Sequence, residues 1–169
     1  KFVRDVLPLE MLAYRIAWAV PFGVLIVFFR QQFPEVKRAL TNKRTVFLLC
    51  LSAAFVSLNW YLFIVTIQRN DIFQASLGYY INPLLNVAIG MIFFSERMRR
   101  LQLVAIGLAV VGVAIQVITF GSVPWVALAL ASSFATYGAI RKRLPVDSIS
   151  GLWLETAILL PVMLIYLFG

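Results

Sequence analysis

The chain has 169 residues, of which 62% are hydrophobic and only 13% are charged. Soluble domains have about 45–50% apolar and about 25% charged residues, so this composition excludes an ordinary soluble domain and predicts an integral membrane protein surrounded by lipid. The net charge is +8, but the basic residues lie between apolar runs and do not form a continuous basic face, so no nucleic-acid partner is expected. Histidine is absent and Cys50 is the only cysteine, which disfavours a metal site, a cofactor or an intrachain disulfide.

Six apolar runs follow one another along the chain. Crossing the hydrocarbon core of a bilayer as a helix takes roughly 20 residues, and each run has about that length. The runs cover residues 9–29, 45–67, 73–94, 101–119, 123–140 and 151–168. The sequence therefore predicts an all-α, polytopic membrane protein whose neighbouring spans run antiparallel.

Lysine and arginine alternate in number between the successive connections. From the first connection to the last there are five, one, three, none and three. The first connection has Arg30, Lys37, Arg38, Lys43 and Arg44, the second has Arg69, the third has Arg97, Arg99 and Arg100, and the fifth has Arg141, Lys142 and Arg143. Positive residues concentrate in cytoplasmic loops, so loops 30–44, 95–100 and 141–150 are predicted to be cytoplasmic. The first run then enters from outside, and because most such proteins start inside, an odd number of further spans is expected before Lys1.

The first run carries Arg15 about 9 Å below its outer start, at 1.5 Å per residue. An arginine at this depth is costly unless its side chain reaches the headgroups or faces a cavity. Both alternatives stay open from the sequence. In the cavity alternative, Arg15 would set the charge preference for a substrate and Trp18 would stack on it.

The run over residues 73–94 has a polar stripe. Ala75, Tyr79, Asn82, Asn86 and Gly90 fall on one face of a helix. In the second run, Asn59 lies close to mid-membrane beside Trp60. Carboxamides face either other helices, where they hold the bundle together, or a wet cavity, where they bind a substrate.

The last run contains Glu155, about 6 Å inside its predicted cytoplasmic end. An intramembrane carboxylate is a candidate functional group, here as a proton carrier or as the counter-charge of a cationic substrate; the alternative is a hydrated position near the interface. Glu155 and Arg15 each lie six residues before a proline, in runs of opposite orientation. This weak similarity suggests an inverted repeat and places the two charges at mirrored depths, so two separate sites are expected.

Several longer segments closely resemble the RarD-type permeases, which belong to the EamA branch of the drug/metabolite transporter superfamily. These segments are EMLAYRIAW, ASLGYYINPLLNVAIGMIFFSERMRRLQ, TFGSVPWVALALASSFATYGAIRKR and GLWLETAILLP. The resemblance extends from about Val6 to the end of the chain. It implies a ten-span fold made of two inverted five-helix repeats, of which this chain is a fragment. Residues 1–119 would hold spans two to five, and residues 120–169 would begin the second repeat with spans six and seven.

The resemblance also implies a central cavity, with the run over 101–119 outside it. Small residues on one stripe of that run, among them Ala105, Ala109 and Gly112, independently favour a packing helix. We therefore expect a permease of the bacterial inner membrane that exports small amphipathic molecules, chloramphenicol-like drugs included, by alternating access, with a proton as a candidate coupling ion and the oligomeric state open. The candidate substrate-binding residues are Arg15, Trp18, Asn59, Tyr79, Asn82, Asn86 and Glu155.

Two other classes compete with this interpretation. A structural or assembly protein would use the same polar residues only to pack helices. An intramembrane enzyme is disfavoured, because no serine has an evident base nearby and no metal-binding cluster is present in the sequence. No catalytic residue is therefore assigned.

Overall fold

The computed structural model describes residues 6–168, and in this range the chain forms seven helices and no strand. The helices are α1 (Pro8–Phe29), α2 (Phe33–Thr41), α3 (Lys43–Gln68), α4 (Ile72–Phe94), α5 (Arg100–Phe120), α6 (Trp125–Arg141) and α7 (Ser148–Phe168). Five of them, α1, α3, α4, α5 and α7, are long and apolar enough to cross a membrane. The remaining predicted span, over residues 123–140, corresponds to α6, which has 17 residues. The predicted all-α, multi-pass fold is confirmed.

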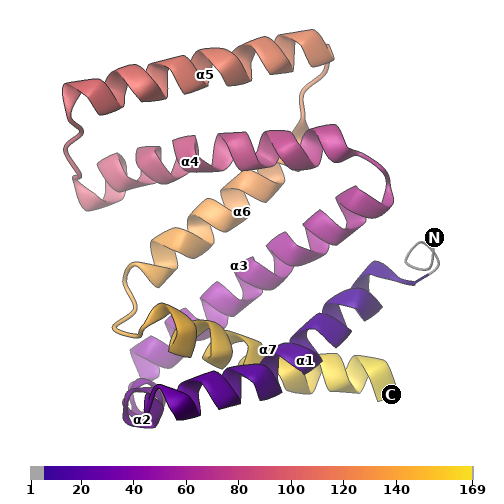
Figure 1. The fold of residues 1–169 in the computed structure, drawn as a ribbon, viewed down its shortest axis with the longest axis vertical. Helices are drawn as coiled ribbons and strands as arrows, with labels where there is room; N and C mark the ends of the chain where they lie inside the picture. The colour runs from indigo at the N-terminus through magenta and orange to yellow at the C-terminus, as the bar shows by residue number, and fades with distance from the viewer. Residues whose placement is uncertain (1–5, 169) are drawn as a thin grey trace.

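The helices lie in successive layers (Figure 1). Helix α5 forms one edge, α4 lies beside it, α6 and α3 follow, and α7 and α1 form the other edge. The most extensive helix–helix contacts join α4 to α6, α1 to α7, and α3 to α6. Segments from both predicted repeats thus interleave, since α6 and α7 each pack against helices from the first part of the chain.

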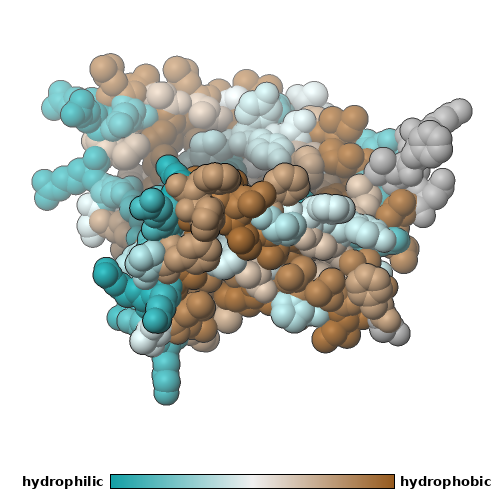
Figure 2. Space-filling view, turned by 60° about the horizontal axis from the view of Figure 1, so that its bottom comes forward, coloured by the Kyte–Doolittle hydropathy of each residue, from teal (hydrophilic) through white to brown (hydrophobic). Residues whose placement is uncertain are grey.

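The three arginine- and lysine-rich connections gather at one end of the bundle. Figure 1 shows α2, the α4–α5 connection and the α6–α7 connection on the same side, and Figure 2 shows hydrophilic residues concentrated there. We call this side the basic end. The alternation seen in the sequence is therefore reproduced in space, while the assignment of this end to the cytoplasm stays a prediction.

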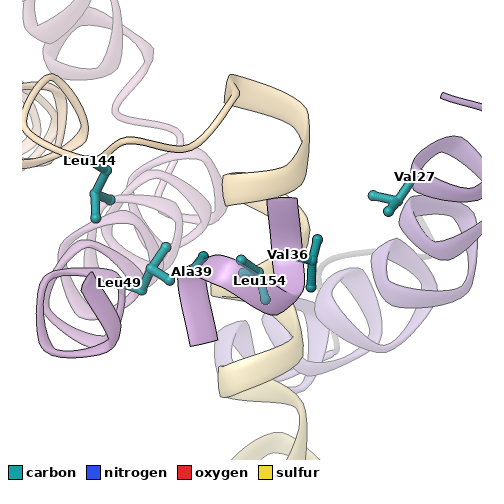
Figure 3. Close-up of a cluster of buried hydrophobic side chains, with 6 residues drawn as sticks. All are labelled: Val27, Val36, Ala39, Leu49, Leu144 and Leu154. Atoms are coloured by element: carbon teal, nitrogen blue, oxygen red, sulfur yellow. The ribbon is translucent and has the colours of Figure 1, made fainter. Parts of the chain in front are cut away.

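Helix α2 was not expected from the sequence. It lies in the first connection, where Val36 and Ala39 are buried and the basic residues between and beside them face outward. Figure 3 shows both side chains gathered with Val27, Leu49 and Leu154, from α1, α3 and α7, at the basic end. Nine residues are too few to stand out as an apolar run, but two buried side chains three residues apart anchor one amphipathic helix against the bundle.

Helix α5 is peripheral, as the family resemblance implied. None of its residues is buried, and among the described helices it packs against α4. The stripe of small residues does not meet a neighbouring helix here, because a Cβ atom added at Gly112 would find no heavy atom within 4 Å. The bundle that positions the polar side chains consists of the other spans.

Candidate functional site

A cavity of about 240 Å³ lies between α1, α3, α4 and α6. All its polar side chains come from four residues that the sequence singled out: Arg15, Asn59, Tyr79 and Asn82. Aromatic rings of Trp60, Phe63 and Phe134 complete much of the wall. The lining residues come from the first half of α4 and from the middle of α6, so the cavity does not reach the basic end.

Arg15 faces this cavity. Its guanidinium carbon lies 4.1 Å from the centroid of the Trp60 ring, in the geometry of a cation–π contact. Arg15 takes part in no ion pair among residues 6–168. Of the two alternatives for Arg15, the structure therefore fits the one in which its side chain faces a cavity. In the described part of the chain, the guanidinium contacts an aromatic ring and has no acidic partner.

Asn59 combines both of the roles that the sequence left open. Its Nδ2 donates hydrogen bonds to the Leu130 carbonyl oxygen at 2.8 Å and to Ser133 Oγ at 3.0 Å, which ties α3 to α6. The same residue lines the cavity. Its position in the wall is thus set by bonds to a neighbouring helix.

The two asparagines of α4 line different pockets. Asn82 lines the cavity, and its Oδ1 accepts a hydrogen bond from Asn86 Nδ2 at 3.1 Å. Asn86 itself lies in a different pocket nearer the basic end, with Glu96 and Lys142, where it faces Gly138 of α6. Asn86 can therefore orient the Asn82 carboxamide, but it does not line the same cavity.

Tyr79 contributes a ring and a hydroxyl to the wall. Its ring packs edge-on against Phe63, with centroids 5.8 Å apart and an interplanar angle of 75°. The next residue, Tyr80, is similarly exposed, at 60% against 64%, but does not line the cavity. This pair of neighbouring tyrosines provides a matched control for experiments on the site.

Trp18 does not join the other candidates. It is 66% exposed and does not line this cavity. The buried face of α1 is formed by Leu12, Ala13 and Ile16, and Trp18 points away from the helices that this face contacts. The cavity instead uses Trp60, which the sequence analysis noted only as the neighbour of Asn59.

Glu155 lies in a second polar cluster, sealed between α3, α6 and α7. Its carboxylate is fully buried. It accepts hydrogen bonds from Ser52 Oγ at 2.6 Å and from the Tyr137 hydroxyl at 3.2 Å, and it forms an ion pair with Arg141 Nη1 at 3.6 Å. The hydrated alternative for Glu155 is wrong, because helices surround the carboxylate and supply its partners.

Sequence reasoning missed two members of this cluster. Tyr137 and Arg141 are four residues apart on α6, so both face the same way, but Arg141 was interpreted only as part of a basic loop. Arg15 and Glu155 have different partners, Trp60 and Arg141, in the described part of the chain, and their roles as two separate sites stay a prediction. Among residues 6–168, no group of three or more histidine, cysteine or acidic side chains is close enough to hold a metal ion.

The sequence was compared with known families and proteins. Residues 1–118 match the model of the EamA-like transporter family. The chain belongs to the EamA-like transporter family. Membership agrees with the helical spans described above, and it establishes a multi-pass protein of a membrane transporter family.

The relatives of this EamA-like chain are bacterial. It is 49% identical over 160 residues to "Protein RarD" of Salmonella typhimurium, covering 95% of this chain and 54% of that protein. It is 46% identical over 167 residues to an "Uncharacterized transporter" of Vibrio cholerae, covering 99% and 55%. It is 32% identical over 164 residues to the "Chloramphenicol-sensitive protein RarD" of Pseudomonas aeruginosa, again covering 95% and 55%.

These matches confirm the RarD-type resemblance and support a place in the bacterial inner membrane. The chain spans about half the length of the curated relatives it matches. No solved structure matches the chain.

Proposed function

We propose that the full-length protein is a secondary transporter that moves small amphipathic molecules across the bacterial inner membrane. The observation that carries this proposal is the cavity between α1, α3, α4 and α6, which holds polar groups and aromatic rings inside the membrane-spanning bundle. Polar side chains at this depth need partners or solvent, and a ligand cavity supplies both. Family membership supports the transport class.

In this proposal, Asn82 and Tyr79 hydrogen-bond the substrate and Arg15 interacts with its charge. Asn86 orients Asn82 through the bond between their carboxamides. Trp18 and Glu155 lie outside the cavity, and we assign Glu155 to the joining of helices. Among the described residues, no carboxylate lines the cavity wall, and we assign no proton carrier there.

The proposed mechanism is alternating access. Residues 1–119 and the segment starting at residue 120 would belong to two inverted repeats that rock about the central site. Loops 30–44, 95–100 and 141–150 would face the cytoplasm, as their basic residues favour. A substrate related to chloramphenicol is suggested by the name of one relative, the "Chloramphenicol-sensitive protein RarD", and is one candidate in the assay below.

A structural or assembly protein is the second candidate function. It is favoured by Asn59, whose amide joins α3 to α6 with two hydrogen bonds. In that case substitutions in the cavity would change the stability of the bundle and would have no selective effect on solute flux. Neither candidate involves catalysis, and we propose that the protein is not an enzyme.

The test is a flux assay with the full-length protein in proteoliposomes, using amphenicols and small aromatic metabolites. Asn82→Leu should lower the flux by on the order of tenfold, because the site loses a hydrogen bond made inside the membrane. Tyr79→Phe should lower flux less, and Tyr80→Phe should leave it unchanged. Equal flux in all three variants, or losses that simply follow the thermal stability, would favour the structural class.

A further inference from the structure

The described part of the cavity wall carries one positive charge, that of Arg15, and no negative charge. The described residues form ion pairs between Arg30 and Asp147, Arg141 and Glu155, and Lys142 and Glu96, and none of these involves the cavity. Among residues 6–168, no aspartate or glutamate lines the cavity. In this part of the wall, the guanidinium of Arg15 is therefore the charged group that a ligand would meet.

Arg15 and its ring partner Trp60 lie at similar distances from the helix ends opposite the basic end. It lies about 10 Å along α1 from the end at Pro8, and Trp60 lies about 12 Å along α3 from the end at Gln68, at 1.5 Å per residue. These two helix ends lie on the side opposite the basic end (Figure 1). Because the guanidinium stacks on a ring at a similar depth, the side chain is not extended toward the headgroups, and Arg15 lines the cavity at this level.

A guanidinium inside a membrane is stabilised by a carboxylate, which accepts its N–H donors in a two-pronged geometry. Among the described residues, the buried carboxylate of Glu155 has such a charged partner, since Arg141 Nη1 lies 3.6 Å from its Oε1. Glu155 is fully buried and points into its own cluster, so it is not free to complement Arg15 or to attract a cationic substrate.

We infer that the substrate is a small organic monoanion whose carboxylate pairs with Arg15, and this inference rests on the proposed transport function. The apolar part of the anion packs against Phe63, Tyr79 and Phe134, whose rings line the same cavity. Cations of similar size are excluded, because they would meet an unpaired positive charge in a region of low dielectric constant. A cavity of about 240 Å³ favours a solute with one ring or a short chain.

Three probes of nearly equal size separate charge from shape: N-benzoylglycine, its neutral amide N-benzoylglycinamide, and the cation N-(2-aminoethyl)benzamide. Their binding is measured by titration calorimetry with the purified full-length protein at neutral pH, where the first probe is an anion. We expect the anion to bind on the order of tenfold more tightly than the neutral amide, and the cation to bind most weakly. This ranking is measured on the unchanged protein and needs no variant to fold.

Arg15→Gln should abolish the preference for the anion over the neutral amide. Arg15→Lys should keep part of the preference, because it retains the charge but loses the planar donors. The matched control is Arg100→Gln at the start of α5, which does not line the cavity and should keep the full preference. An equal ranking of the three probes, tightest binding of the cation, no anion binding at millimolar concentration, or a preference that survives Arg15→Gln would overturn the inference.

The same titrations separate this inference from the proposed transport site. Asn82→Leu should weaken all three probes if the cavity is the binding site. Probes that bind unchanged to Asn82→Leu would contradict the proposed site, whereas probes that lose affinity there but show no charge preference would contradict only the assignment of an anion.

Discussion

The cavity around Arg15 and the cluster around Glu155 are the two places where this bundle holds a charged side chain well inside its membrane-spanning helices. Glu155 has partners from α3 and α6 and no exposed surface. Arg15 has one aromatic ring beneath it and an open cavity beside it. A charge that is fully satisfied by its own protein stabilises a particular packing of helices, whereas a charge left without a counter-ion is available to a ligand.

The largest expected difference between the two regions is in stability. Glu155→Ala leaves the Arg141 guanidinium, whose side chain is only 12% exposed, without its counter-charge. Removing one member of a buried pair costs about 3–5 kcal/mol of unfolding free energy. Arg15→Ala, in contrast, removes a cation–π contact that contributes about 0.5–1 kcal/mol.

Both variants are compared by thermal and denaturant unfolding of the full-length protein in detergent. If Arg15→Ala destabilises the protein as much as Glu155→Ala does, Arg15 is structural and the contrast between the two regions fails.

A second test adds a methyl group beside the Arg141–Glu155 ion pair and keeps both charged residues. A Cβ atom at Gly151 would collide with the Arg141 guanidinium, which packs directly on this glycine. Gly151→Ala should therefore push Arg141 away from Glu155 and lower the unfolding free energy by about 1–3 kcal/mol. The matched control is Gly107→Ala on α5, where nothing lies within 4 Å, and it should be neutral or slightly stabilising. Equal thermal midpoints for the two variants would show that close packing at Gly151 does not support the ion pair.

A smaller effect is expected at the two tyrosines. Tyr137→Phe deletes the hydroxyl that donates to Glu155 and should cost about 1–2 kcal/mol of unfolding free energy. Tyr79→Phe should leave stability nearly unchanged, because no hydrogen bond of its hydroxyl is found in the described part of the chain, but it should lower substrate flux. The thermal midpoint should therefore fall in Tyr137→Phe, and the flux should fall in Tyr79→Phe. A reversed pattern would exchange the roles assigned to the two regions.

The smallest effect concerns Asp147, where the sealed cluster reaches the basic end. The carbonyl oxygen of Asp147 accepts a hydrogen bond from Arg141 Nη2 at 3.1 Å. The Ile149 N–H, the Gln32 side chain and the nearby charge of Arg30 hold the pKa of the Asp147 carboxyl below its usual 3.8. Because the folded-state pKa is lowered, this contribution to stability is complete above the unfolded value and is lost as the pH falls through the folded value.

Thermal midpoints of the full-length protein between about pH 3 and pH 6 measure this contribution by comparison with Asp147→Asn. The difference between the two proteins should shrink as the pH is lowered. A difference that is constant over this range would show that the charge of Asp147 is not responsible.

Much of the fold was predictable because it depends on local properties of the chain. Five of the predicted spans lie within one described helix each, and the run over residues 123–140 begins two residues before α6, since the length of an apolar run decides whether it can cross a bilayer. The alternating basic connections lie at one end of the bundle, as six antiparallel spans require. Helix α2 escaped prediction because its amphipathic pattern covers only nine residues.

The candidate site was predictable only in part. Arg15, Asn59, Tyr79 and Asn82 were selected because polar groups are costly in lipid, and the structure brings these four to one cavity. Trp18, Asn86 and Glu155 were selected by the same argument but lie elsewhere. Position along a helix gives the depth of a side chain, but which neighbour it meets depends on how the helices are rotated and paired.

The sequence by itself therefore determined the class of this protein, the order of its apolar helices and the position of each polar residue along its helix, because hydrophobic length and helical period are properties of single segments. Only the tertiary structure decided that Glu155 is enclosed by Ser52, Tyr137 and Arg141, while Arg15 faces a cavity over Trp60. The physical reason is that each of these contacts joins helices distant in the sequence. Their partners are selected by the packing of the whole bundle.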